Sequence, residues 1–380
     1  MKEFMEKQLA QRTLSQSLRQ LKPSLNLADF SSNDYLGFAR SGELYKLIKD
    51  NETIYAKILF PGAGASRLIS GNHALYDVVE KKIAGVHKAE RALIFNSGYD
   101  ANLGLFASLA SRHDTVFYDE YVHASIRDGI RLSLAKSYSF KHNNLDDFKK
   151  KLSRARGRVI VAVESVYSMD GIERFKQTGQ QNYWIEDLVE YCFEKGFYVI
   201  VDEAHSTGVF GERGEGIVAQ KKLETKVFAR VHTFGKALGV HGAAVLGSGL
   251  LADYLVNYAR SFIYTTALPP HSLLSILSSY EYLEKNTDTI QKLRENIDFF
   301  KSGFYMEENT NDSPIHYKIV GENKKCLELS RKCQETGFDV RAILSPTVPR
   351  NTERLRICLH SFNTRKEISG LFSLLGNIPE

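Results

Sequence analysis

Between about residues 40 and 270, short runs of apolar residues alternate with stretches in which apolar positions recur at helical spacing. The apolar runs predict strands at 92–95, 115–119, 158–165, 197–202, 226–233 and 242–248. The amphipathic stretches predict helices that include 73–86, 100–111, 145–154 and 185–195. Continuous apolar strands joined by helical crossovers are typical of a mostly parallel sheet covered on both faces. We therefore expect an α/β domain.

The pattern differs on either side of this region. Residues 2–21 predict a helical arm that carries Leu14, Leu18 and Leu21 on one face and ends at Pro23. After residue 270 the chain predicts a smaller α+β unit, with elements at 270–302, 316–320, 323–335, 338–343, 354–361 and from 365. We expect three parts: an arm (1–39), a large domain (40–270) and a small C-terminal domain (271–380).

Composition and charge narrow the class of protein. The chain of 380 residues is 43% hydrophobic and 25% charged, which is ordinary for a globular protein. Its net charge of +5 is spread without a basic block, which argues against nucleic acid as a main partner. The first residues carry charges throughout, and the longest uncharged stretch, 237–252, is too short and too rich in glycine to span a membrane.

The cysteines indicate the compartment. Cys192, Cys326, Cys333 and Cys358 form no CxxC pair and show no paired spacing. Buried packing in a reducing environment is the simplest interpretation. Together with the lack of a secretion signal, this predicts a cytoplasmic protein with no membrane segment.

The apolar run FYVIVDEAH (197–205) ends in three polar side chains, Asp202, Glu203 and His205. Asp-Glu-Ala-His also occurs in helicases, but these require a phosphate loop GxxxxGK[ST]. The only Gly-Lys pair here is Gly235-Lys236, which alanine follows, so a nucleotide motor is excluded. A metal site is poorly supported, because no HExxH and no cysteine pair completes a ligand set.

Other polar groups follow predicted strands, where open α/β sheets bind their ligands. The turn Ser97-Gly98-Tyr99 precedes a helix and could hold a phosphate, although such turns are often only tight connections. Lys236 lies in a glycine-rich segment, where a buried amine would be a nucleophile and a solvated one an ordinary surface group. His123 could stack on a planar ligand or simply cap a helix. Ser168 and Thr233 are small hydroxyls that serve either as ligand contacts or as turn residues.

Taken in order, these segments resemble the α-oxoamine synthases, a branch of the fold-type-I pyridoxal-phosphate enzymes. The resemblance runs from residue 33 to residue 361, most of the chain. It rests on NDYLG (33–37), GASRLISG (64–71), NSGYDAN (96–102), VHAS (122–125), ESVYSMDG (164–171), VDEAHSTGVFGERGEG (201–216), HTFGKALG (232–239), YTTALPP (264–270) and RLRICLHS (354–361). The implied fold is a mostly parallel central sheet in a large domain, followed by a smaller α+β domain.

The resemblance implies a cofactor, pyridoxal 5'-phosphate, and a role for each matching residue. Lys236 matches the lysine that captures the cofactor aldehyde as a Schiff base, and Asp202 matches the carboxylate at the pyridine nitrogen. His205 matches the residue at the phenolic oxygen, and His123 matches the ring stacked on the cofactor. The remaining contacts to ring or phosphate are implied for Ser97, Gly98, Tyr99, Ser168, Thr233 and, from a neighbouring subunit of a homodimer, Thr266. Glu203 is expected to face away and order the strand end.

The resemblance also implies the substrates and the reaction. Asn33 and Arg356 match groups that hold an amino acid carboxylate. Thr347 matches a substrate contact near the C-terminal domain, and Arg19 matches a contact to the acyl substrate. The family condenses a small amino acid with an acyl thioester and releases carbon dioxide. The run 232–270 is most similar to the biotin-pathway branch, which joins L-alanine to a pimeloyl thioester of coenzyme A or an acyl carrier protein. The alternatives are a member that uses glycine or serine with another acyl group, and a non-catalytic subunit of the family.

Besides a shorter segment between the arm and NDYLG (33–37), which bears on the match of Arg19, two departures from the family pattern are visible. Residues 172–188 are longer than the family's corresponding segment and differ from it, and His241 replaces a small residue in the lysine loop. We have no physical account of the second change.

Overall fold

The computed structural model describes residues 1–21, 26–172, 184–303 and 311–376. Contacts divide the chain into two compact units. The larger contains residues 36–168 and 172–291, and the smaller contains 1–35, 169–171 and 292–380. The boundary predicted at residue 270 therefore differs from the division by contacts, which assigns 271–291 to the larger unit.

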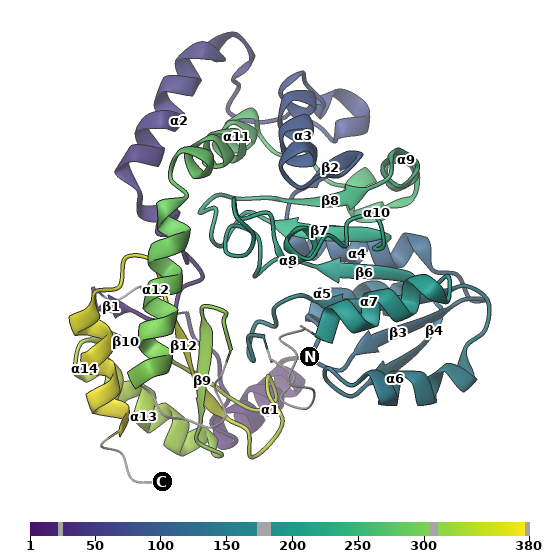
Figure 1. The fold of residues 1–380 in the computed structure, drawn as a ribbon. Coiled ribbons are helices and arrows are strands. Elements are labelled where there is room, and N and C mark those ends of the chain that lie inside the picture. Colours follow the sequence, from purple (N-terminus) through teal and green to yellow (C-terminus); the bar gives the residue numbers. More distant parts are fainter. Residues whose placement is uncertain (22–25, 173–183, 304–310, 377–380) are drawn as a thin grey trace. The chain divides into compact units, whose positions relative to one another are not determined.

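A seven-stranded sheet forms the centre of the larger unit, in the order β2-β8-β7-β6-β5-β3-β4 (Figure 1). Its strands are β2 (Arg91–Phe95), β3 (Thr115–Asp119), β4 (Lys136–Phe140), β5 (Val159–Glu164), β6 (Tyr198–Asp202), β7 (Ala229–Thr233) and β8 (Ala243–Gly247). All neighbouring strands are parallel except the pairs that include β8. The nine residues between β7 and β8 are too few for a parallel crossover, so these strands run antiparallel. The predicted mostly parallel sheet is confirmed.

Helices cover both faces of this sheet, with α7 in front of it and α4 behind it in Figure 1. The helices of the larger unit before β5 are α2 (Gly42–Ile54), α3 (Leu75–Val86), α4 (Gly98–Leu109), α5 (Ala124–Leu132) and α6 (Leu145–Lys151). Those after it are α7 (Trp184–Glu194), α8 (Ile217–Gln220), α9 (Gly249–Tyr258), α10 (Arg260–Ile263) and α11 (Pro270–Lys285). Fully buried side chains of sheet and helices, such as Val161, Leu105 and Leu255, form the core.

The smaller unit is built on an antiparallel sheet in the order β11-β12-β9. Its strands are β9 (Ile315–Ile319), β11 (Arg341–Ile343) and β12 (Arg354–Cys358), and a parallel pair is formed by β1 (Ala28–Asp29) and β10 (Phe338–Asp339). Its helices are α1 (Lys2–Leu14), α13 (Asn323–Glu335) and α14 (Arg365–Gly376), and α12 (Asp288–Gly303) has most of its residues here.

Two expectations about elements are wrong, and one strand was missed. The helix of the arm ends at Leu14 and buries none of its residues, and Leu14, Leu18 and Leu21 are all exposed. Pro23 lies outside the described residues. The helical pattern at 270–302 is two helices, with a break after Lys285. The strand β4 was not predicted, because this edge strand is mostly exposed and carries alternate polar residues.

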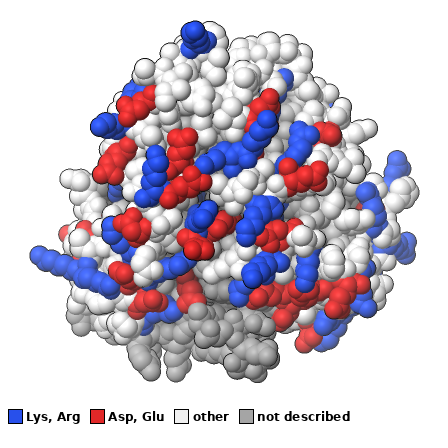
Figure 2. Space-filling view, turned by 45° about the horizontal axis from the view of Figure 1, so that its top comes forward, with Lys and Arg blue, Asp and Glu red and all other residues white. Residues whose placement is uncertain are grey.

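The surface carries mixed charge, and the cysteines are internal. On the face shown in Figure 2, basic and acidic side chains are interspersed. Cys192, Cys326, Cys333 and Cys358 are free and buried, as the spacing predicts. None of the helices in the described part of the chain is long and apolar enough to cross a membrane.

Candidate active site

The carboxyl ends of β5, β6 and β7 meet at one edge of the large sheet, and each ends in a polar residue. These residues are Glu164, Asp202 and Thr233, and Lys236 follows three positions later. Parallel strands align their ends, so residues far apart in sequence are brought together there. Hydrogen bonds through Asn102 and Ser125 connect Asp202 to His123. Lys236 is bonded to Thr233, whose hydroxyl lies against the segment that follows Asp202.

Asp202 is a buried carboxylate with a defined orientation. One oxygen, Oδ1, accepts a hydrogen bond from the amide of Ala204 at 2.8 Å. The other, Oδ2, accepts one from Asn102 Nδ2 at 2.7 Å. Only 5% of the residue is exposed, so solvent contributes little to its position. The carboxylate is thereby held in one rotamer, with lone pairs left on both oxygens for a further donor.

Asn102 is a site residue that the sequence reasoning missed. It lies on α4, is 2% exposed, and also donates from Nδ2 to Ser125 Oγ at 3.1 Å. Ser125 Oγ lies 2.8 Å from His123 Nδ1. Asn102 therefore links the carboxylate of Asp202, through Ser125, to His123 at the start of α5. The sequence signal that could have identified Asn102 is a polar residue on the inner, apolar face of α4.

His123 caps α5 and keeps its ring accessible. Its Nδ1 accepts a hydrogen bond from the amide of Ser125 at 3.2 Å. The residue as a whole is exposed. Desolvation lowers the pKa of His123, and Asp202 opposes this shift. A ring with a lowered pKa is neutral at pH 7 and suited to stacking on a flat ligand.

Glu164 is a second residue that the motif analysis did not single out. Its Oε1 accepts a hydrogen bond from the backbone amide of His123 at 2.5 Å, and 4% of it is exposed. Burial, with a further contribution from Asp202, raises the pKa of Glu164 well above its ordinary value. The carboxyl group of Glu164 thus anchors the backbone at His123, and its raised pKa favours the protonated state of this group.

This shift predicts a pH dependence of stability. Because the folded pKa of Glu164 is raised, its contribution is fully present below the unfolded pKa and is lost as pH rises towards the folded pKa. Glu164→Gln keeps a side-chain oxygen that can accept the hydrogen bond from the His123 amide, and it removes the ionisable carboxyl group. We expect urea unfolding between pH 5 and 8 to show a flatter profile in the variant, by up to about 1.4 kcal/mol per pH unit. Parallel profiles for the two proteins would contradict the raised pKa.

The predicted phosphate turn is the start of α4. Ser97 is its N-cap, and its hydroxyl accepts from the amide of Asp100 at 3.1 Å and donates to Asp100 Oδ2 at 2.8 Å. A Cβ at Gly98 would lie 2.4 Å from Thr233 Cγ2, so only glycine permits this approach of α4 to the end of β7. Tyr99 is 44% exposed, donates from its hydroxyl to the carboxylate of Asp128, and meets His123 edge to face.

Lys236 and Thr233 lie at the start of the β7–β8 connection. The Nζ of Lys236 donates to Thr233 Oγ1 at 3.0 Å, and Lys236 is half-buried. Thr233 Oγ1 in turn lies 3.4 Å from the carbonyl oxygen of Ala204, its acceptor on the β6 side. The amine is therefore directed towards the strand ends that carry Asp202.

The other predicted cofactor residues lie in different surroundings. His205 is 6% exposed and lies three residues after the end of β6. Ser168 is half-buried after β5. Thr266 is exposed, and its carbonyl oxygen accepts a hydrogen bond from Asn96 Nδ2 at 2.8 Å.

Glu203 faces away from Asp202 and holds the start of α8. Its Oε1 accepts hydrogen bonds from the amides of Ile217 and Val218, at 2.7 and 3.1 Å. A Cβ at Gly216 would lie 2.6 Å from Glu203 Oε2, and Gly216 has a φ of 99°, so glycine is required there. The expectation that Glu203 orders the strand end agrees with these contacts.

The smaller unit brings together the residues predicted to bind substrate, in two pairs. Arg356 Nη2 donates to Asn33 Oδ1 at 2.8 Å, and Arg356 is 7% exposed. Arg19 Nη2 donates to Thr347 Oγ1 at 3.3 Å, and both residues are exposed. Each pair joins a residue from the first 35 to one near β12. No group of three or more His, Cys, Asp or Glu side chains in the described residues could hold a metal ion.

Comparison with known proteins identifies the class. Residues 26–371 match the aminotransferase class I and II family, and the chain belongs to this family. An 8-amino-7-oxononanoate synthase of Emericella nidulans is 43% identical, over 91% of this chain and 88% of that protein.

Two solved structures are similar. An 8-amino-7-oxononanoate synthase from Francisella tularensis has a TM-score of 0.74 and 30% identity, over 92% of this chain and 96% of that chain. A serine palmitoyltransferase with pyridoxal phosphate has a TM-score of 0.82 and 25% identity, over 92% of this chain and 86% of that chain. The predicted resemblance to the α-oxoamine synthases, with the fold it implies, is confirmed.

Proposed function

We propose that the protein is a pyridoxal-phosphate-dependent acyltransferase that condenses L-alanine with a pimeloyl thioester to 8-amino-7-oxononanoate, as in biotin synthesis. The observation that carries the proposal is the convergence of Lys236, Asp202 and His123 at one end of the large sheet. The 43% identity to a synthase of that name selects this reaction within the family. The same site with glycine or serine as substrate is the second candidate, favoured by the fold shared with serine palmitoyltransferase.

The residues of the larger unit fit the cofactor. Asp202 is an oriented carboxylate suited to a protonated ring nitrogen, and His123 offers an accessible ring for stacking. The close approach of Gly98 to Thr233 leaves the start of α4 without a side chain that would obstruct a phosphate. We assign ring and phosphate contacts also to Ser97, Tyr99, Ser168 and His205. When bound, pyridoxal phosphate supplies an electron-accepting ring that stabilises negative charge at the α-carbon of the amino acid.

The side chains of this chain perform the remaining tasks. Lys236 Nζ would hold the aldehyde end of the cofactor, and its free amine would take the proton from the α-carbon of the amino acid. Asp202, oriented by the hydrogen bond from Asn102, would face the ring nitrogen. Arg356, oriented by Asn33, binds the carboxylate of the amino acid, for which a planar guanidinium is well suited. The α-carbon then bonds to the thioester carbonyl, the thiol departs, and the carboxylate leaves as carbon dioxide.

The presence of Lys236, Asp202 and His123 together argues against a non-catalytic subunit. A homodimer in which Thr266 reaches the partner's cofactor is part of the proposal, supported by the exposure of Thr266. The free, buried cysteines support a cytoplasmic location. Either coenzyme A or an acyl carrier protein would present the same thioester.

Product analysis over a panel of substrates tests the proposed function. L-alanine with a pimeloyl thioester should turn over at least about tenfold better than glycine with the same thioester, because one methyl group contributes about 1–3 kcal/mol in a pocket. Purified protein is assayed with alanine, glycine and serine against pimeloyl, acetyl, succinyl and palmitoyl thioesters. A clear preference for glycine with an acetyl or succinyl thioester, or for serine with a palmitoyl thioester, would show that the proposed substrates are wrong. The proposed cofactor would not be affected by that result.

A further inference from the structure

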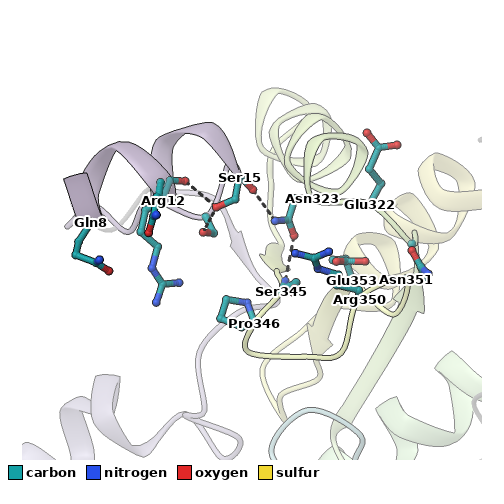
Figure 3. Close-up of a pocket in the computed structure, with 13 residues that line it drawn as sticks. Gln8, Arg12, Ser15, Glu322, Asn323, Ser345, Pro346, Arg350, Asn351 and Glu353 are labelled. Atoms are coloured by element: carbon teal, nitrogen blue, oxygen red, sulfur yellow. Dashed lines mark hydrogen bonds between the residues drawn. The ribbon is translucent and has the colours of Figure 1, made fainter. Parts of the chain in front are cut away.

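The N-terminal arm of the smaller unit is attached without a hydrophobic interface. Helix α1 buries none of its side chains. A cavity of about 660 Å³ separates it from the loops around Asn323, Ser345 and Arg350, and the residues lining this cavity are mostly polar (Figure 3). Burial of apolar surface usually determines how an element is placed, and here it contributes little. Individual polar contacts must therefore decide where the arm lies.

Among the described residues, two side-chain hydrogen bonds join residues 1–21, the first part of the arm, to the rest of the smaller unit. One is the bond from Arg19 to Thr347. The other is donated by Asn323 Nδ2 to the carbonyl oxygen of Ser15 at 2.8 Å, in the turn that follows α1. Asn323 is the first residue of α13, a helix whose Cys326 and Cys333 are fully buried, so its position is set by the core.

The same side chain also fixes the loop that carries Thr347. Asn323 Oδ1 accepts a hydrogen bond from the amide of Ser345 at 3.0 Å, as the dashed lines in Figure 3 show. Within the loop, the amide of Thr347 donates to the carbonyl oxygen of Leu344 at 2.8 Å. One amide group thus determines two things: the turn four residues before Arg19 and the loop two residues before Thr347.

We propose that Asn323 is a positioning residue for the acyl substrate: it sets the Arg19–Thr347 pair, which receives the free carboxylate at the far end of the acyl chain. This inference rests on the proposed function, which assigns a dicarboxylic acyl group to the enzyme. A guanidinium beside a hydroxyl is suited to a carboxylate and not to an ester. Asn323 acts only through Arg19 and Thr347 and does not touch the substrate.

The bridge requires an amide. Its nitrogen donates to a carbonyl and its oxygen accepts from an N–H, so aspartate could satisfy only the second contact and would repel the Ser15 carbonyl oxygen. Asn323→Asp therefore releases the arm while keeping the loop contact. Asn351→Asp is the matched control, because Asn351 lines the same cavity and its side chain makes no hydrogen bond to the described residues. Both substitutions add the same charge at the same cavity.

Steady-state kinetics test the proposal. Asn323→Asp should raise the KM for the pimeloyl thioester on the order of threefold to tenfold, the effect of one hydrogen bond, with the KM for L-alanine unchanged. Asn351→Asp should alter neither. In an Arg19→Gln background, which itself raises the KM for the thioester, Asn323→Asp should have no further effect. An unchanged KM in Asn323→Asp, or an equal additional loss in the Arg19→Gln background, would overturn the proposal.

Limited proteolysis gives a measurement that is independent of activity. Trypsin should cleave after Arg19 about threefold to tenfold faster in Asn323→Asp than in the wild type or Asn351→Asp, when the peptides are quantified by mass spectrometry. Equal rates would refute the role of Asn323 even if the enzyme proves to be the proposed synthase. Faster cleavage in a protein that does not use pimeloyl thioesters would instead refute the proposed function and leave the attachment of the arm established.

Discussion

Replacing Lys236 by alanine will lower turnover on the order of 10³-fold or more and will abolish covalent attachment of the cofactor. Lys236 is half-buried, and its Nζ is bonded to Thr233 Oγ1 next to the strand end that carries Asp202. The substitution removes the nucleophile and the proton acceptor together.

The measurement combines borohydride reduction with peptide mapping and assays of turnover. In the wild type, the reduced cofactor should be found on the peptide that contains Lys236, and in the variant on none. Lys150→Ala is the control, because Lys150 is an exposed lysine on α6. Cofactor bound covalently at another lysine, or turnover close to that of the wild type, would show that the assignment of Lys236 is wrong.

Asp202→Asn should lower the rate of α-proton exchange in L-alanine on the order of 10²- to 10³-fold while the cofactor still binds. The substitution keeps the shape of a side chain that is 5% exposed and removes its charge. An amide no longer holds a proton on the ring nitrogen, so negative charge at the α-carbon is less stabilised, a loss comparable to that of one preorganised electrostatic contact.

Exchange of the α-proton is followed by NMR in deuterated buffer without thioester, which isolates this step from acyl transfer. Asp50→Asn, at an exposed position on α2, is the matched control for the loss of a carboxylate. Exchange at the wild-type rate in Asp202→Asn would show that Asp202 does not act on the ring nitrogen. Loss of cofactor binding would show that its main role is structural, through the hydrogen bond with Asn102.

The sequence by itself determined the framework of the larger unit. The strands at 92–95 and 115–119 were predicted because their apolar runs are continuous, and a continuous run is what burial on both faces requires. Asp202 and Lys236 could be found because each follows such a strand, where ligands bind in open sheets. The order of the motifs then indicated the family. These signals are local, or depend only on order along the chain.

Elements without a local signal were missed or misjudged. The edge strand β4 pairs on one side only and keeps most of its residues exposed, so it needs no apolar run. The helical pattern of the arm continues past Leu14, but helices in proteins are stabilised mainly by packing, and α1 buries none of its residues.

The tertiary structure alone decided which side chains meet. Asn102 reaches Asp202 across 100 positions, and Arg356 reaches Asn33 across 323. Glu164 became an anchor for His123 because two strand ends and a helix start converge there. Asn323 became a bridge because the turn after α1 and the loop at Ser345 lie on either side of it. Such pairings depend on crossovers and packing over the whole chain, and periodicity along the sequence describes only which face of an element is buried.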